Sequence, residues 1–164
     1  MQELLKSLQA LIKLHESLYT IAVDKMNDLK HDNVERLGEQ LKAEQSHLAA
    51  IRQVDRQRER AVQSLAHLYG MEETSPTVSD LLAVIQDDTE RQQLAEAREQ
   101  LLEVMDRLQK QNELNQQLTY QSLQVVNFSL SMFRPPNKET MNYSKEEVKG
   151  VRGVQRKGLF DSQI

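Results

Sequence analysis

The sequence repeats apolar residues at alternating spacings of three and four along most of residues 2–133. Residues three and four apart lie on one face of an α-helix, so the spacing predicts long amphipathic helices. The first stripe consists of Leu4, Leu8, Leu11, His15, Leu18, Ala22, Met26 and Leu29. Five glycines, three prolines, 4% aromatic and 38% hydrophobic residues fit narrow helical seams better than a thick core.

The stripes and the breaks between them predict four helices. We expect a first helix from about Gln2 to Lys30, a second from about Val34 to Tyr69, a short helix over Val78–Gln86 and a long one from about Thr89 to Phe133. The connection between the first two is short, so they should form an antiparallel hairpin, and the second helix is the expected partner of the last. The predicted fold class is all-α: an elongated antiparallel helical hairpin within a three-helix, coiled-coil-like bundle, with a flexible C-terminal tail.

Local signals mark the helix ends. Asp32 is predicted to cap the second helix, with Glu35 in the capping-box position. Gly70 occupies the position after a helix that favours left-handed backbone. Thr77 and Asp80 form a second capping pair, which opens the short helix.

The chain divides into a helical part, residues 1–133, and a tail, residues 134–164, that begins at Arg134-Pro135-Pro136. The few apolar residues of the tail do not offset the entropy of ordering it, so we expect it to be disordered until a partner binds. The tail holds seven basic and four acidic residues, net +3, which leaves −7 on residues 1–133 because the whole chain carries −4. An acidic body does not fit a nucleic-acid-binding protein.

The sequence offers no catalytic constellation. The four histidines, at positions 15, 31, 47 and 67, lack metal-ligand spacing, and His15 is the one expected to be half-buried. Adjacent carboxylates do not face one site on a helix, and the arginines of "RQRER" (56–60) can pair with Asp55 and Glu59. We therefore expect no enzyme, no metal and no cofactor. Without cysteine, signal peptide or membrane-spanning run, a cytoplasmic location is expected, with no stable membrane insertion.

The stretch "QNELNQQLTYQSL" (111–123) places amide and hydroxyl side chains on a seam that is otherwise apolar. One interpretation is a polar layer that fixes the register between helices of the chain itself. The other is that this face pairs with a partner. The sequence leaves both open.

The end of the last helix carries apolar residues on more than one face, and the first helix is too short to cover all of them. Either the tail or the first helix covers this surface, or a partner binds it. We favour partner binding. The predicted partner-binding residues are Val125, Val126, Phe128, Leu130, Met132, Phe133, Met141, Tyr143, Leu159 and Phe160.

At these residues the chain resembles the FlgN family of flagellar export chaperones. The resemblance rests on the N-terminal hairpin, the N-x-x-N-x-x-L stretch (Asn112, Asn115, Leu118), the following "SLQVVNFSL", the helix-ending proline and a tail with a tyrosine and a closing apolar pair. It implies a cytoplasmic chaperone of the hook-associated proteins FlgK and FlgL. Such a chaperone prevents premature assembly and delivers its clients to the export gate, where the tail tyrosine is implicated, without ATP or a cofactor.

Two other classes remain as alternatives. A structural, self-associating coiled-coil protein without a client would form a stable oligomer, whereas a chaperone would be a monomer or weak homodimer that forms a 1:1 complex. A regulator that binds nucleic acid through its basic tail would lose affinity steeply with salt. The acidic body and the scarcity of aromatics argue against this last class.

Overall fold

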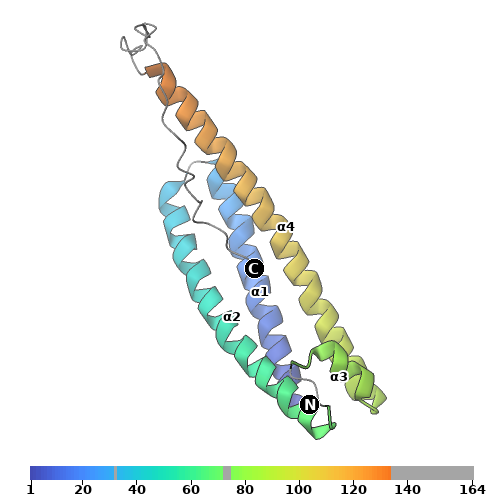
Figure 1. Cartoon of the computed structure of the whole chain (residues 1–164). Coiled ribbons are helices and arrows are strands. Elements are labelled where there is room, and N and C mark those ends of the chain that lie inside the picture. The colour runs from blue at the N-terminus through green and yellow to red at the C-terminus, as the bar shows by residue number, and fades with distance from the viewer. Residues whose placement is uncertain (32, 72–74, 134–164) are drawn as a thin grey trace, which may run out of the picture. The chain divides into compact units, whose positions relative to one another are not determined.

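The computed structural model describes residues 1–31, 33–71 and 75–133, and helices make up nearly all of them (Figure 1). The helices are α1 (Gln2–Lys30), α2 (Val34–Leu68), α3 (Val78–Val84) and α4 (Asp88–Phe133). No strand occurs in these three ranges, which confirms the all-α fold class. The helix ends predicted from the sequence agree with these observed ends to within two residues.

The start of α2 differs from the predicted cap. Its N-cap is Asn33, whose side-chain oxygen accepts from the Arg36 N–H at 3.3 Å. The prediction for Asp32 was wrong by one position, because the helix begins directly after Asn33, whose side chain then reaches the third helical N–H.

The other two end signals are confirmed. Gly70 has φ +67°; its N–H donates to the His67 carbonyl at 3.1 Å, and the next N–H, of Met71, donates to the Ala66 carbonyl at 2.9 Å. This pair of bonds is the Schellman motif, which needs a left-handed residue. At α3, Asp80 N–H donates to Thr77 Oγ1 at 3.3 Å while Thr77 N–H donates to Asp80 Oδ2 at 2.8 Å, a complete capping box.

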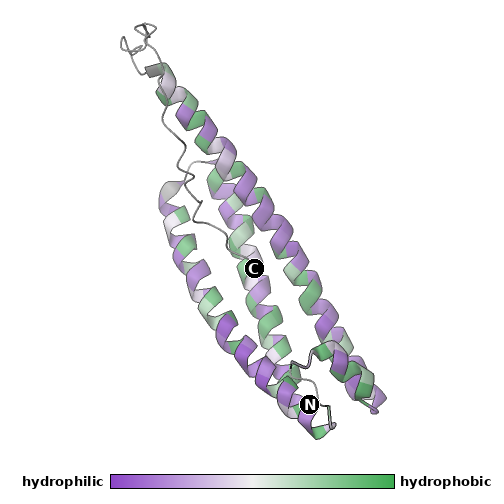
Figure 2. Cartoon of the chain, viewed as in Figure 1, coloured by the Kyte–Doolittle hydropathy of each residue, from purple (hydrophilic) through white to green (hydrophobic). Residues whose placement is uncertain are grey.

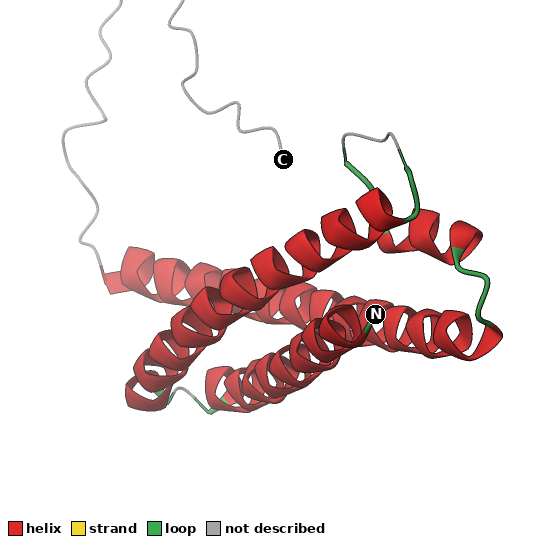
Figure 3. Ribbon diagram, turned by 90° about the horizontal axis from the view of Figure 1, so that it is seen from below, coloured by secondary structure: helices red, strands yellow, loops and turns green. Residues whose placement is uncertain are grey.

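The main core lies at the end of the bundle that carries the N-terminus, where α3 also lies (Figures 1 and 3). Parts of all four helices meet there. Its buried residues are Leu4, Leu8, Ala61, Val62, Ala66, Val78, Leu81, Ile85, Leu94 and Ala97. α2 runs antiparallel to α1, as expected for a hairpin, and α4 runs parallel to α1 (Figure 1).

Fewer apolar side chains are buried along the bundle as the distance from α3 increases. A second, smaller cluster contains Leu18, Ala22 and Leu108, and beside it Arg107 of α4 lies 4.5 Å from the ring centre of Tyr19 of α1. Figure 2 shows why the core is narrow: along α2 and α4 the hydrophobic residues form separate bands among hydrophilic ones. Narrow bands bury one stripe of each helix and leave the rest to solvent.

Polar contacts join α1 and α2 near the hairpin connection. Lys25 pairs with Glu44, and Gln40 Nε2 donates to Asp28 Oδ2 at 2.6 Å. Asp28 is buried in α1, so the Gln40 amide satisfies a carboxylate that burial would otherwise penalise. The hairpin end is therefore fastened by side-chain hydrogen bonds and the α3 end by apolar packing.

Two compact units divide the chain. Met1–Asn127 form the first, and the second begins at Phe128, within α4. Residues 134–164 lie outside the described residues, so the division into a helical part ending at residue 133 and a tail stays a prediction.

Candidate functional site

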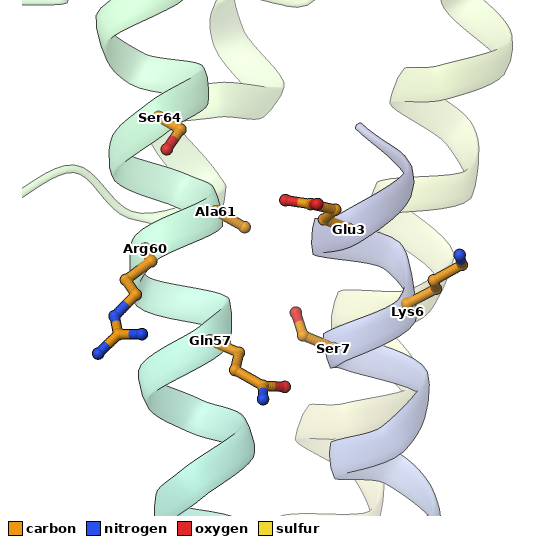
Figure 4. A pocket seen from close by; sticks show the side chains of 7 residues that line it. All are labelled: Glu3, Lys6, Ser7, Gln57, Arg60, Ala61 and Ser64. Atoms are coloured by element: carbon orange, nitrogen blue, oxygen red, sulfur yellow. The ribbon is translucent and has the colours of Figure 1, made fainter.

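One polar pocket between α1 and α2, about 380 Å³ in volume, shows what this surface offers chemically (Figure 4). Glu3 and Gln57 point into the space between the two helices, whereas Lys6 and Arg60 point away from it. Ser7 Oγ donates to the Leu4 carbonyl at 2.7 Å, so its hydroxyl is already used within its own helix. The pocket brings no nucleophile next to a base, and its two cations do not converge on a ligand.

A serine–histidine pair, which the sequence did not reveal, lies between the same helices. His47 Nδ1 is 2.8 Å from the Ala43 carbonyl oxygen, so this nitrogen donates to it, and Nε2 lies 2.8 Å from the Ser17 hydroxyl oxygen. A catalytic triad needs a carboxylate on the second ring nitrogen, and here a carbonyl occupies that position. The pair is exposed and lies between helix middles, whose backbone N–H groups are already bonded and cannot form an oxyanion hole.

Arg58 and His15, two further candidates from the sequence, have structural partners. Arg58 of the "RQRER" run pairs with Asp55 at 2.7 Å, as expected, and His15 is half-buried, with Nδ1 2.7 Å from the Leu11 carbonyl oxygen. Within the described residues, no three histidine or acidic side chains come together in a way that could hold a metal ion. The helices described here also lack any apolar stretch of bilayer-spanning length.

The polar layer of α4 is directed into the bundle. Asn115, only 3% exposed, donates from Nδ2 to the Ala22 carbonyl of α1 at 2.8 Å. Gln111, also buried, donates from Nε2 to Asn115 Oδ1 at 3.3 Å. For Asn115 and Gln111 the first interpretation therefore holds: they form a polar layer that fixes the register between α4 and α1. Asn115 also borders an open groove, which its neighbours Asn112, Gln116 and Thr119 line as well.

The last twenty residues of α4, 114–133, contain no charged residue, in a chain whose charged fraction is 28%. Its apolar side chains are nevertheless exposed. Five of the predicted partner-binding residues are between 54% and 70% exposed: Val125, Val126, Phe128, Leu130 and Met132. A solvated helix normally carries charges on such positions, so an uncharged and apolar exposed surface is characteristic of a binding site.

The first helix reaches part of this surface without covering it. A shallow pocket of about 360 Å³ is lined by Leu29 and Lys30 of α1 together with Leu118, Val125 and Val126 of α4. Even so, Val125 and Val126 keep more than half of their surface in solvent. Coverage by the first helix, the alternative weighed above, is thus only partial.

Several predicted residues cannot be placed further. Phe133 ends α4, but its side chain is not among the described ones. The tail residues Met141, Tyr143, Leu159 and Phe160 lie outside the described residues.

Sequence reasoning missed Leu48 of α2 and Tyr120 and Leu123 of α4, which are large, exposed and gathered around one groove. The absence of charge over residues 114–133 was the signal that could have found the last two.

Comparisons with known proteins agree with these features. No solved structure matches the chain significantly. A Bacillus subtilis (strain 168) protein, the uncharacterized protein YvyG, is 31% identical over 160 residues, which cover 98% of this chain and 96% of that protein. The family model described as FlgN protein matches residues 1–148. The chain therefore belongs to the FlgN family of flagellar export chaperones, which bind hook-associated proteins.

Proposed function

We propose that this protein is a cytoplasmic chaperone of the hook–filament junction proteins, the hook-associated proteins of FlgK and FlgL type. It holds an amphipathic terminal helix of a client, blocks premature coiled-coil pairing of that helix and delivers the client to the export gate. The observation that carries the proposal is the exposed, charge-free apolar end of α4.

Residues Val125–Phe133 and the tail residues Met141, Tyr143, Leu159 and Phe160 are the proposed clamp. A helix of the client would lay its apolar stripe on the exposed side chains of α4, as amphipathic helices do in hydrophobic grooves. Tyr143 is the proposed contact with the export gate. Release needs no nucleotide, because competition at the gate for the same contacts removes the client.

Clients with disordered terminal segments suit a preformed surface. The segment that folds on binding loses conformational entropy, so a partner that is already ordered lowers the total cost of the complex. α4 is helical up to Phe133 in the free chain, and its exposed side chains require no rearrangement to meet a client.

Calorimetry with the C-terminal peptide of a junction protein tests the proposal. The peptide is titrated into residues 1–164 and into a truncation that ends at residue 133. Binding lost on truncation assigns the client to the tail, and binding retained by both assigns it to the helices and leaves the tail for the export gate. If neither chain binds, the structural coiled coil without a client becomes the better reading, and light scattering should then show a stable oligomer.

A pair of substitutions tests the clamp itself. Phe128→Ser combined with Phe133→Ser should abolish the complex, because the apolar contact area of two aromatic rings is lost. Circular dichroism should show unchanged helicity, since Phe128 is 67% exposed and packs little in the free chain. Unchanged affinity for the peptide would refute the clamp.

A further inference from the structure

An open groove runs between α2 and α4, with α1 as its floor. One section, about 490 Å³ in volume, has Leu18 on the floor, Leu48 on the α2 wall, and Tyr120 and Leu123 on the α4 wall. Leu48 is 45% and Leu123 55% exposed, so the apolar walls of the groove are largely uncovered. A second hollow, about 380 Å³, lies between the same three helices, closer to α3.

α4 carries two heptad seams, and only one of them is used within the bundle. The first contains Leu108, Gln111 and Asn115 and faces α1. The second repeats at spacings of four and three on the adjoining face, which Asn115 borders, and consists of Asn112, Gln116, Thr119, Leu123, Val126 and Leu130. Its first four residues line the groove, and its last two belong to the clamp proposed above. The groove and the clamp thus follow one continuous stripe of a single helix.

The section of the groove between Leu48 and Leu123 is electrically neutral. Its lining includes two charged side chains, Lys25 and Glu44, and these form an ion pair with each other. The α4 wall offers amides and hydroxyls instead of charges. A nucleic acid or an acidic peptide would find no unpaired cation among the lining residues, so the matching occupant also presents an uncharged face.

The backbone N–H and C=O groups of the occupant must also find hydrogen-bond partners. The walls are helices, whose backbone N–H and C=O groups are bonded within each helix, so an extended segment would find no backbone partner there. A helix brings its own hydrogen bonds with it. From Asn112 to Leu123 the α4 wall measures about 17 Å, or roughly three helical turns.

We propose that this groove binds a helix of the client as the fourth helix of a bundle, packed between α2 and α4. The inference rests on the proposed chaperone function and extends its contact surface from the end of α4 into the body of the protein. The client helix carries an apolar stripe that meets Leu48 and Leu123, flanked by amide or hydroxyl residues that meet the amides of Asn112 and Gln116. These two amides set the register of the client, as buried polar positions do in coiled coils.

Matched leucine substitutions in the full chain test the groove. Leu48→Gln combined with Leu123→Gln removes apolar contacts from both walls. The control pair is Leu68→Gln with Leu114→Gln: these residues are 76% and 49% exposed on the same two helices, outside the lining of the groove. Affinity for the client's C-terminal peptide is measured by calorimetry for the unaltered chain and for both variants, with urea unfolding as a check on stability.

We expect the groove pair to weaken binding about 30-fold, since each leucine has about half of its side chain left to bury. The control pair should change affinity less than about threefold, because surface substitutions away from an interface have little effect. Equal affinities for all three chains would overturn the groove while the chaperone function stands. No binding by the unaltered chain would instead refute the proposed function, so the two failures are distinct.

A fluorescent reporter separates the client from other occupants. The chain has no cysteine, so Thr119→Cys can carry a single environment-sensitive dye in the groove. Client binding should shift the emission of the dye to the blue, and binding without a shift overturns the groove. A blue shift that grows with protein concentration alone, with a doubled mass by light scattering, would assign the groove to a second copy and also overturn the proposal.

Discussion

Replacing Asn115 by aspartate tests how the buried polar layer holds α4 on α1. The side-chain nitrogen of Asn115 donates to the Ala22 carbonyl at 2.8 Å and is shielded from water. Aspartate has the same size, but it places an acceptor oxygen, and at neutral pH a charge, against that carbonyl. Lys25, which lines the same groove, is already paired with Glu44. Gln111 can still donate to one oxygen of the introduced carboxylate, but no cation pairs with it, so the buried charge should lower the free energy of unfolding by about 3 kcal/mol at about pH 7.

The loss should depend on pH, with a definite sign. Burial favours the neutral acid, so the pKa of the introduced carboxyl in the folded state is raised above the value of about 3.9 in the unfolded state. Below the unfolded-state value both states are protonated, and the neutral hydroxyl can donate to the Ala22 carbonyl. The penalty is therefore small at about pH 4 and grows as the pH rises toward the folded-state pKa, above which it stays constant.

Urea unfolding followed by circular dichroism measures this difference. The free energies of the unaltered chain, Asn115→Asp and Asn115→Leu are compared at about pH 4 and about pH 7. The leucine variant lacks the donor but carries no charge, so its difference from the unaltered chain should be the same at both pH values. A loss for the aspartate variant that is equal at both pH values, or below about 1 kcal/mol at about pH 7, would refute a buried Asn115.

Three further predictions follow from the helix ends and the charge distribution. Gly70→Ala should cost about 1–2 kcal/mol of stability because its φ of +67° is left-handed, whereas Gly38→Ala, inside α2 with open space around it, should add about 0.5–1 kcal/mol; urea unfolding distinguishes the two signs. The side-chain and backbone hydrogen bonds from Thr77 lower the pKa of Asp80, so the cap stabilises α3 above the ordinary pKa of a carboxyl and is lost as the pH falls through the lowered value. NMR titration of Thr77→Val should show the Asp80 pKa moving back up. Client affinity should change less than about threefold when salt is raised fourfold, because the surface is uncharged, and a steep loss would point to nucleic acid or another charged partner.

The helices were predictable because the signals for them are local. The seam that includes Leu4, Leu8 and Leu11 and the capping pair at Thr77 lie within a few residues of the structure they specify. The helix that α4 packs against was harder to predict from the sequence. The second helix was the expected partner, but the cross-helix hydrogen bonds described for the polar layer of α4 go to Ala22 and Met26 of α1. α4 has two seams of similar spacing, and spacing alone does not say which one faces which helix.

The binding surface was only partly predictable for a related reason. Apolar residues on more than one face of a helix show that something must cover it, and Val125 and Phe128 are indeed exposed. The groove depends on Leu48, which lies far from Leu123 in sequence and lines the same groove only because α2 and α4 both lie beside α1. Its residues carry no motif, because an uncovered seam has the same composition as a covered one.

Because burial is uneven along the bundle, local unfolding should occur more readily at one end than at the other. Amide protons near Leu4 and Leu94, in the apolar cluster beside α3, should exchange with solvent most slowly, because buried contacts set the free energy of local opening. Near the hairpin connection polar contacts dominate, and Gln40 Oε1 is buried without a hydrogen-bond partner among the described residues, so exchange there should be faster than beside α3. The short connection between Lys30 and Val34 keeps α1 and α2 together at that end, so local opening there frays helical turns while the α3 end stays closed. A client helix in the groove between α2 and α4 would then be held least firmly at this end, and a pull from the same end would remove it turn by turn.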